Sequence, residues 1–352
     1  MMSMDKRPLL YVALSAVLFG ISTPIAKLLV TDMSPVALAG LLYLGAFFGL
    51  SLYKIVGRFA SADRMSRPAP LERKDLPWLS GAILAGGVLA PIALMTGLTT
   101  VSGFSASLLL NLEGLATAFI AVVLFKEFAG RRLWMALALM TMAGSFLAWD
   151  PGQGEMDLAG PLLIILAMIG WGFDNNLTQR ISGKDPAQIA RIKGLIAGTT
   201  SLSLAVLMGA QIPLGASILY AILLGSLSYG LSLVLFIRAL EGLGSSRAGA
   251  FFSLGPFAGA AISIVLLGET LTWPMILATI LMAMGVWLIL TEQHSHSHSH
   301  QWLSHTHTHE QDIHHSHHHP NGQEGAHSHE HEHEPMSHDH EHWPDQHHRH
   351  DH

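Results

Sequence analysis

The hydrophobic positions of this chain group into long, nearly continuous runs. Ten such runs occur before residue 292, and each approaches the roughly 20 apolar residues that a helix needs to cross a bilayer. The pattern predicts an all-α integral membrane protein with ten transmembrane helices. The runs lie at residues 9–30, 35–56, 77–97, 104–125, 132–149, 160–179, 187–209, 216–238, 246–267 and 272–291.

Basic residues fall in alternate loops between these runs. Lys6 and Arg7 precede the first run, and six bases lie between positions 54 and 74, whereas the opposite loops carry acids such as Asp32 and Glu269. Because short basic loops stay on the cytoplasmic side, both termini are predicted to be cytoplasmic. The first run lacks a small-residue cleavage site, so we expect it to be retained. The protein is then a multi-pass protein of the inner (plasma) membrane, in contact with the lipid bilayer.

The ten runs divide into two similar halves. At an offset of 142 residues, the segment Leu124–Glu127 matches Leu266–Glu269, and Ala106 and Leu112 match Ala248 and Leu254. Each half holds five spans, an odd number, so the second copy must be inverted relative to the first. Inverted repeats are typical of alternating-access transporters, whose substrate sites lie near the bilayer midplane. We expect a first repeat at residues 8–149 and a second at 160–291.

These features resemble the tandem EamA-domain branch of the drug/metabolite transporter superfamily. The resemblance rests on the ten spans, the duplication, and an aromatic-Gly pair in the first helix of each half, Phe19-Gly20 and Trp171-Gly172. It covers residues 8–291 and implies a transporter, without specifying the cargo. The chain departs from the usual pattern in the fourth span, where the first repeat has Glu113-Gly114 and the second has Gly255-Pro256.

Glu113 is the leading candidate for a substrate or coupling-ion site. It lies near the middle of the fourth run, where an ionisable group is costly and normally faces a cavity or a partner. It could bind a cation or exchange protons, or it could simply be paired or hydrogen-bonded within the bundle. Thr117 lies one turn away on the same face and could share a ligand, whereas Asn111 points elsewhere and is expected to make a packing hydrogen bond.

Further candidates lie in the sixth, seventh and ninth spans. Asp174 and Lys193 are at similar depths and are expected to form an ion pair, as a structural clamp or as part of an inner gate. Gly255-Pro256 could break the ninth helix opposite Glu113, or Gly255 could serve helix packing. The predicted substrate or coupling-ion residues are Glu113, Thr117, Asp174, Asn175, Asn176, Lys193, Gly255 and Pro256.

The last 60 residues differ in composition from the rest. All 23 histidines of the chain lie there, in alternation with Ser, Thr, Glu or Asp, and few apolar residues accompany them, so residues 293–352 are predicted to form a disordered cytoplasmic tail. Imidazole and carboxylate ligands favour Zn, Ni or Co, although the tail could instead respond to pH. The predicted metal ligands are His294, His296, His298, His300, His305, His307, His309, His314, His315, His317, His318, His319, His329, His331, His333, His338, His340 and His342.

Composition narrows the function. The chain has no cysteine, its histidines all lie in the tail, and it has no Gly-rich phosphate loop, so we expect no enzyme and no cofactor required for the fold. No basic stripe supports nucleic-acid binding. We favour an exporter of a divalent transition metal such as Ni, Co or Zn. The alternatives are a metabolite or drug exporter with a regulatory tail and a membrane metal sensor, and a homodimer is compatible with the sequence.

Overall fold

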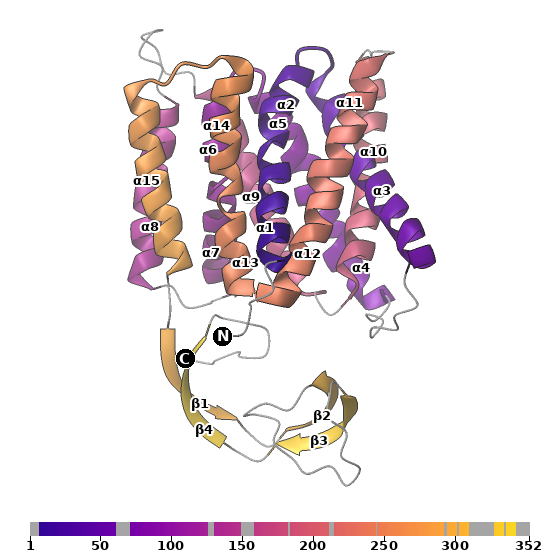
Figure 1. Cartoon of the computed structure of the whole chain (residues 1–352), viewed down its shortest axis with the longest axis vertical. Helices are drawn as coiled ribbons and strands as arrows, with labels where there is room; N and C mark the ends of the chain where they lie inside the picture. The colour runs from indigo at the N-terminus through magenta and orange to yellow at the C-terminus, as the bar shows by residue number, and fades with distance from the viewer. Residues whose placement is uncertain are drawn as a thin grey trace. The chain divides into compact units, whose positions relative to one another are not determined.

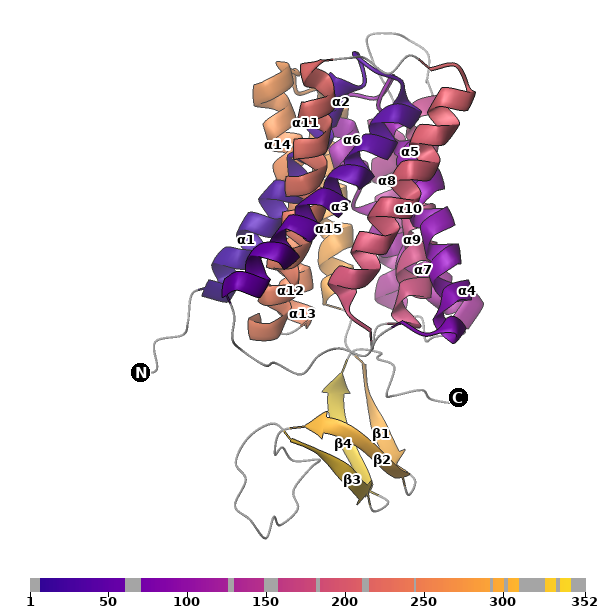
Figure 2. The same cartoon turned by 90° about the vertical axis from the view of Figure 1, so that its right-hand side faces the viewer.

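The computed structural model contains two compact units, residues 1–292 and 293–352. It describes residues 7–60, 71–125, 130–148, 158–181, 184–210, 215–243, 245–291, 294–300, 303–309, 327–333 and 336–342. The first unit is a bundle of helices that run roughly side by side (Figures 1 and 2).

Ten helical rods make up the described part of the bundle, and several are composed of shorter pieces. In the first repeat they are α1 (Arg7–Gly20) with α2 (Ser22–Leu29), α3 (Pro35–Ala60), η1 (Arg73–Asp75) with α4 (Leu76–Ala82), η2 (Ile83–Leu89) and α5 (Ala90–Gly97), α6 (Gly103–Leu109) with α7 (Leu112–Phe125), and α8 (Arg131–Leu147). In the second they are α9 (Ala159–Gln179), α10 (Pro186–Leu207), α11 (Ala216–Leu224) with η3 (Gly225–Leu231) and α12 (Ser232–Leu243), α13 (Ser245–Phe252) with α14 (Gly255–Leu267), and α15 (Trp273–Leu290).

The prediction of an all-α membrane protein is confirmed. Seven of the rods within the described residues are long and apolar enough to cross a membrane. The other three have local causes: α8 has only 17 residues, the ninth rod is interrupted before α14, and Asp174, Asn175 and Asn176 lower the mean hydropathy of α9. We call the end where α1 begins and α9 ends the basic face, and the end where α2 ends and α6 begins the acidic face.

The internal repeat is visible in backbone details. The third and eighth rods each contain a seven-residue π-helix, η2 and η3, and these start and end 142 residues apart. The fourth and ninth rods are both interrupted, at residues 110–111 and 253–254. Equivalent helices also pair across the bundle, α3 with α10, α8 with α15, and α6 with α14 (Figure 1).

Glycines allow the two repeats to approach closely. A Cβ on Gly20 of α1 would overlap the carbonyl oxygen of Gly255 on α14, and one on Gly172 of α9 would lie 3.0 Å from the amide nitrogen of Thr117 on α7. Because small residues let transmembrane backbones touch, both crossings are fixed by van der Waals packing. The aromatic-Gly pairs of the sequence therefore mark equivalent helix contacts.

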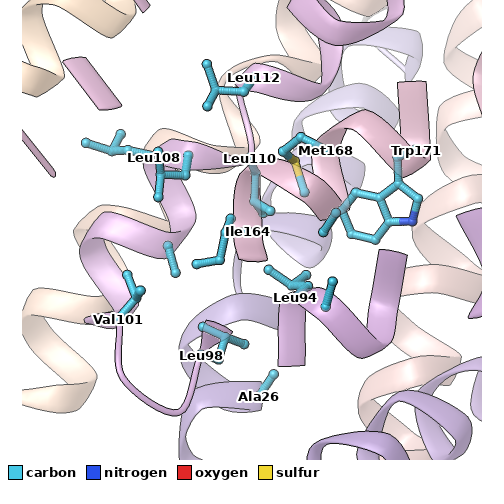
Figure 3. Packing of buried hydrophobic residues seen from close by; sticks show 14 of the residues in the cluster. Ala26, Leu94, Leu98, Val101, Leu108, Leu110, Leu112, Ile164, Met168 and Trp171 are labelled. Atoms are coloured by element: carbon cyan, nitrogen blue, oxygen red, sulfur yellow. The ribbon is translucent and has the colours of Figure 1, made fainter. Parts of the chain in front are cut away.

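The main hydrophobic core fills the space between α2, α5, α6 and α9. Leu98, Leu108 and Ile164 are fully buried in it, and Trp171 lies beside Met168 at its edge (Figure 3). Such a core holds the rods in fixed relative positions. Trp171 is thus anchored by packing, while its indole NH remains free to bond a neighbouring helix.

The second unit differs from the disorder that its composition predicts. Four seven-residue segments form strands, with β1 (His294–His300) antiparallel to β4 (Met336–His342) and β2 (Leu303–His309) antiparallel to β3 (His327–His333). The alternation of His with Ser, Thr, Glu or Asp has the period of a strand, which is the physical reason for this pairing. Isolated two-stranded pairs are marginally stable in water, so these strands give the tail no core.

Candidate functional site

Glu113 begins the inner half of a broken transmembrane helix. The chain leaves the helical pattern at Leu110 and Asn111, and the Asn111 side chain donates to the Leu108 carbonyl oxygen at 3.1 Å, as expected for a packing hydrogen bond. Glu113 then occupies the first turn of α7. An acid is favourable there because the helix dipole is positive at its N-terminus. The break therefore stabilises a carboxylate inside the bundle.

The Glu113 carboxylate is held by α9. The Asn175 amide donates to Glu113 Oε1 at 2.9 Å and lies 3.1 Å from Thr117 Oγ1, whose hydroxyl donates to the Glu113 carbonyl oxygen at 2.8 Å. Glu113 is half-buried and Asn175 is exposed, while a Cβ on Gly114 would meet nothing within 4 Å. The carboxylate therefore borders open space, and Thr117 and Glu113 share a ligand as predicted.

Asn176 serves the packing of the same two helices. Its buried amide donates to the Thr117 carbonyl oxygen at 3.0 Å and to the Gly172 carbonyl oxygen at 2.8 Å. These bonds tie α9 to α7 next to the close approach at Gly172. Asn176 therefore positions Asn175 and Glu113, and its predicted role in binding stays a prediction.

The predicted ion pair between Asp174 and Lys193 is confirmed. Lys193 Nζ lies 2.5 Å from both carboxylate oxygens, and the Thr178 hydroxyl donates to Oδ1 at 2.9 Å. A Cβ on Gly86 would overlap the Asp174 carboxylate, so the π-helix η2 provides the space for this pair. The charges of Asp174 and Lys193 also act on Glu113. The pair links α9 to α10 beside the Glu113 site.

The π-helix η2 also exposes a backbone acceptor. The Gly86 carbonyl oxygen accepts the Tyr43 hydroxyl at 2.6 Å and the Trp171 indole NH at 2.9 Å. A π-bulge disturbs the regular helical hydrogen bonds, which frees such a carbonyl for side chains. Tyr43 packs 6.1 Å from Tyr229 between ring centroids, and Tyr229 packs 6.2 Å from Phe19. Aromatic residues from three rods therefore surround the centre of the bundle.

A cavity of about 320 Å³ opens next to these aromatic rings. It extends from Lys193 and Tyr229 to Lys184 in the turn between α9 and α10, at the basic face. Its walls are mainly apolar and its size falls in the range of small-molecule sites. The lining residues are Tyr43, Ala46, Leu50, Thr178, Lys184, Pro186, Ile189, Ala190, Lys193, Gly194, Tyr229 and Leu233.

An ion cluster lies at the basic end of this cavity. Lys184 bonds Glu72 at 2.8 Å and lies 3.4 Å from Asp75, and Glu72 also pairs with Lys74 at 2.9 Å. Hydrogen bonds from Lys184 and then Lys74 lower the pKa of Glu72 from 4.5 to about 2, and the bond to Glu72 raises the pKa of Lys184. The cluster joins the start of the third rod to the α9–α10 turn.

At the acidic face, Glu269 caps a helix that the sequence did not indicate. Its carboxylate accepts the amide NH groups of Gly103 at 2.6 Å and Phe104 at 2.8 Å, at the start of α6. The prediction that it bonds the next helix in the chain is wrong, because the symmetry of the repeat brings α6 closer in space. Glu127, its predicted counterpart, lies outside the described residues.

Lys27 closes the same face. Its ammonium donates to the carbonyl oxygen of Leu98 at 2.6 Å and that of Thr99 at 3.3 Å, at the end of α5. A cation is favourable at a helix C-terminus because unpaired carbonyl groups point toward it. Lys27 therefore ties α2 to α5, instead of extending freely to the interface.

The structure places Gly255 and Pro256 at the start of α14, directly after the predicted break. Gly255 lies against α1, where a Cβ would be 2.9 Å from the Ala16 carbonyl oxygen, and Gly259 contacts Gly20. This agrees with the packing interpretation of the pair. Its place in the substrate site stays a prediction.

The predicted metal ligands are of two kinds. His314, His315, His317, His318 and His319 lie outside the described residues, and the side chains of the other tail histidines are likewise not described. Among the side chains that are described, no group of three or more His, Cys, Asp or Glu lies together. The described bundle therefore offers no cluster of metal ligands, and metal binding by the tail stays a prediction.

Sequence reasoning missed several residues of the site. Tyr43, Gly86 and the partners of Lys184 were not predicted. One signal was present for Gly86, because its counterpart at the 142-residue offset is Ser228, beside Tyr229, within the repeated π-helix. For Tyr43, a single aromatic residue in an apolar run gives no indication of which neighbour it will bond.

Comparisons with known proteins agree with this architecture. Residues 6–149 and 158–291 each match the EamA-like transporter family. The chain is 25% identical over 293 residues to an uncharacterized transporter of Methanothermobacter thermautotrophicus, covering 78% of this chain and 83% of that protein. It is 30% identical over 156 residues to an uncharacterized protein of Pseudomonas aeruginosa, covering 44% and 54%.

A crystal structure supports the fold alone. It superposes with a TM-score of 0.55 at 16% identity, covering 81% of this chain and 96% of the other. Two complete family matches, the ten rods and the repeated π-helices together establish the assignment. The chain belongs to the EamA-like transporter family and is a multi-pass membrane transporter.

Proposed function

We propose that this chain is a secondary transporter that works by alternating access, with Glu113 as the residue that couples cargo to protons. The observation that carries the proposal is the half-buried Glu113 carboxylate at a helix break, held by Asn175 and bordering open space. An acid in the middle of a membrane protein normally belongs to an ion or substrate pathway. Its protonation would change the charge of the site as the two repeats rock.

The two faces of the bundle supply the closing contacts for such a cycle. Glu269 and Lys27 join helices at the acidic face, and the Glu72–Lys184 cluster joins helices at the basic face. The cavity lies between Glu113 and the basic face. With the alternate basic loops, we infer that this face is cytoplasmic and that the protein, in the inner membrane, exports its cargo.

For the cargo, the bundle favours a small organic solute. The sequence suggests a divalent metal because of the histidine tail, but binding such a metal within the bundle would require several donor side chains together. Among the described side chains no such group exists, whereas the cavity is apolar and aromatic. Metal export remains the second candidate function, supported by the tail, and the tail otherwise tunes the transporter.

The coupling role can be tested with full-length protein in proteoliposomes that carry a pH-sensitive dye. An imposed pH gradient should drive uptake of candidate solutes with proton movement, and Glu113→Gln should abolish both because it cannot ionise. Glu113→Asp should retain part of the activity. Asp32→Asn, at the acidic face, is a matched control that should behave as the unaltered protein. Unchanged proton-coupled transport in Glu113→Gln would refute the proposal.

A cellular assay separates the two cargo candidates. Cells that express the full chain, or Glu113→Gln, are challenged with Ni, Co and Zn salts, and their metal content is measured. Lower metal content that depends on Glu113 would establish metal export. Equal metal content in both strains would exclude it and leave the organic-solute proposal.

A further inference from the structure

The charges around Glu113 are unequally matched. Asp174 is neutralised by Lys193 at 2.5 Å, whereas the Glu113 carboxylate accepts an uncharged amide from Asn175. Among the ion pairs of the described residues, none includes Glu113. With Glu113 ionised, this group of three ionisable side chains therefore carries one net negative charge.

The other lysines near the cavity or the site are engaged as well. Lys184 pairs with Glu72 and Asp75 at the basic face, and Lys27 bonds backbone carbonyl groups at the acidic face. Since a lone charge in a membrane protein interior is costly, the site favours a ligand that brings one positive charge. A proton meets this need in one state, and a singly charged cargo could meet it in another.

The walls next to Glu113 suit the rest of such a ligand. Tyr43 and Tyr229 line the cavity, and both interact electrostatically with Glu113. Aromatic faces attract organic cations through their quadrupoles. Ala46, Leu50 and Leu233 add apolar surface within the cavity of about 320 Å³. This combination accommodates an ammonium group attached to a small apolar body.

We propose that the cargo is a monovalent organic cation, an amine of small size, whose ammonium group pairs with ionised Glu113 and whose apolar body lies against Tyr43 and Tyr229. The inference rests on the transporter function proposed above and names its substrate class. Binding of the amine and of a proton to Glu113 would exclude each other. Exchange of one for the other is then balanced in charge.

A matched series of ligands tests this assignment. Purified full-length protein in detergent is titrated by calorimetry with 3-methylbutylamine, L-leucine, 4-methylpentanoate and NiCl₂, which present a cation, a zwitterion, an anion and a metal. The amine should bind at least about tenfold more tightly than leucine or the anion, as a single ionic contact warrants. Its affinity should fall as the pH is lowered, because protons compete for Glu113.

Variants separate the site from general damage. Glu113→Gln should weaken amine binding by at least about tenfold, and Tyr229→Leu should weaken it by about fivefold through loss of the aromatic face. Asp32→Asn should bind as the unaltered protein does. Size-exclusion profiles establish that each variant is folded, and Tyr229→Leu keeps the test valid if Glu113→Gln does not fold.

The outcomes distinguish the cargo assignment from the coupling role. Preference for leucine or the anion, or equal binding of all three organic ligands, overturns the amine assignment. Tight NiCl₂ binding that requires Glu113 overturns it in favour of a metal. In both cases the coupling role survives if Glu113→Gln still abolishes proton-coupled transport in proteoliposomes. If proton-coupled amine transport is unaffected by Glu113→Gln, the proposed function itself fails.

Discussion

The two repeats share a scaffold but differ in chemistry. α7 and α14 both begin after a two-residue interruption, and each contacts the first helix of the other repeat at a glycine, Gly172 for α7 and Gly20 for α14. Yet α7 carries Glu113 where α14 carries Gly255. The same backbone arrangement therefore presents a carboxylate on one side and only small residues on the other.

The charged partners of Glu113 follow the same asymmetry. Asp174 and Lys193 belong to the second repeat, and the corresponding positions in the first are Ser22 and Leu42, by the alignment of Trp171 with Phe19 and of Pro186 with Pro35. Symmetry of the helices allows two equivalent rocking positions. A transporter that moves one charge needs one charged site, so the chemistry is concentrated at a single seam, formed by α7, α9 and α10.

The largest expected effect is loss of a charge at that seam. Lys193→Met leaves the Asp174 carboxylate buried and unpaired, which should lower the free energy of unfolding by about 3–5 kcal/mol. Leu42→Met, at the equivalent uncharged position, should have an effect of about 1 kcal/mol or less. Denaturation in mixed micelles measures both values.

The double variant Lys193→Met/Asp174→Asn sharpens this comparison. Removing both charges should recover much of the lost stability, because no uncompensated charge remains. A double variant as unstable as the single one would mean that Lys193 acts through packing of its aliphatic part and that the ion pair contributes little.

The second effect concerns the shared scaffold. Gly20→Ala places a methyl group against the Gly255 carbonyl oxygen, and the repeats must separate locally, so stability should fall by about 1–3 kcal/mol. Gly172→Ala has a nearest atom at 3.0 Å and should cost less, while Gly114→Ala meets nothing within 4 Å and is the control. Thermal unfolding of the three variants should follow this order. Equal effects would show that close packing is unimportant at these crossings.

Much of the scaffold could be predicted from the sequence, because long apolar runs in a membrane protein have few alternatives to spanning helices. Depth along each run also predicted the ion pair between Asp174 and Lys193. By contrast, the partner of Glu269 could not be predicted, since proximity along the chain was a poor guide to proximity in space. The π-helix at Gly86 was hidden for a related reason, as π-bulges depend on side-chain bonds from other rods, here Tyr43 and Trp171.

A smaller effect is expected at the acidic face. Glu269→Gln keeps the shape of the side chain but removes the negative charge that caps α6, so the free energy of unfolding should fall by about 1 kcal/mol. The offset of 142 residues makes Glu127 the counterpart, and Glu127→Gln should have a similar effect if the repeat symmetry extends to this cap. Denaturation of both variants tests this. A neutral result for Glu269→Gln would mean that hydrogen bonding alone maintains the cap.

The smallest effect is expected at the basic face, where the ion cluster is largely exposed. The pKa of Glu72 is lowered to about 2 in the folded protein from an ordinary 4.5, so its pairing with Lys184 and Lys74 stabilises the fold above pH 4.5 and is lost as the pH falls from there toward 2. The unaltered protein should therefore lose thermal stability in that window, and Glu72→Gln should lose less. The difference should shrink at high salt, because exposed ion pairs are screened. If the two melting curves depend on pH identically, the cluster contributes nothing to stability, and the seam around Asp174 and Lys193 supplies the charge pairing on which the fold depends.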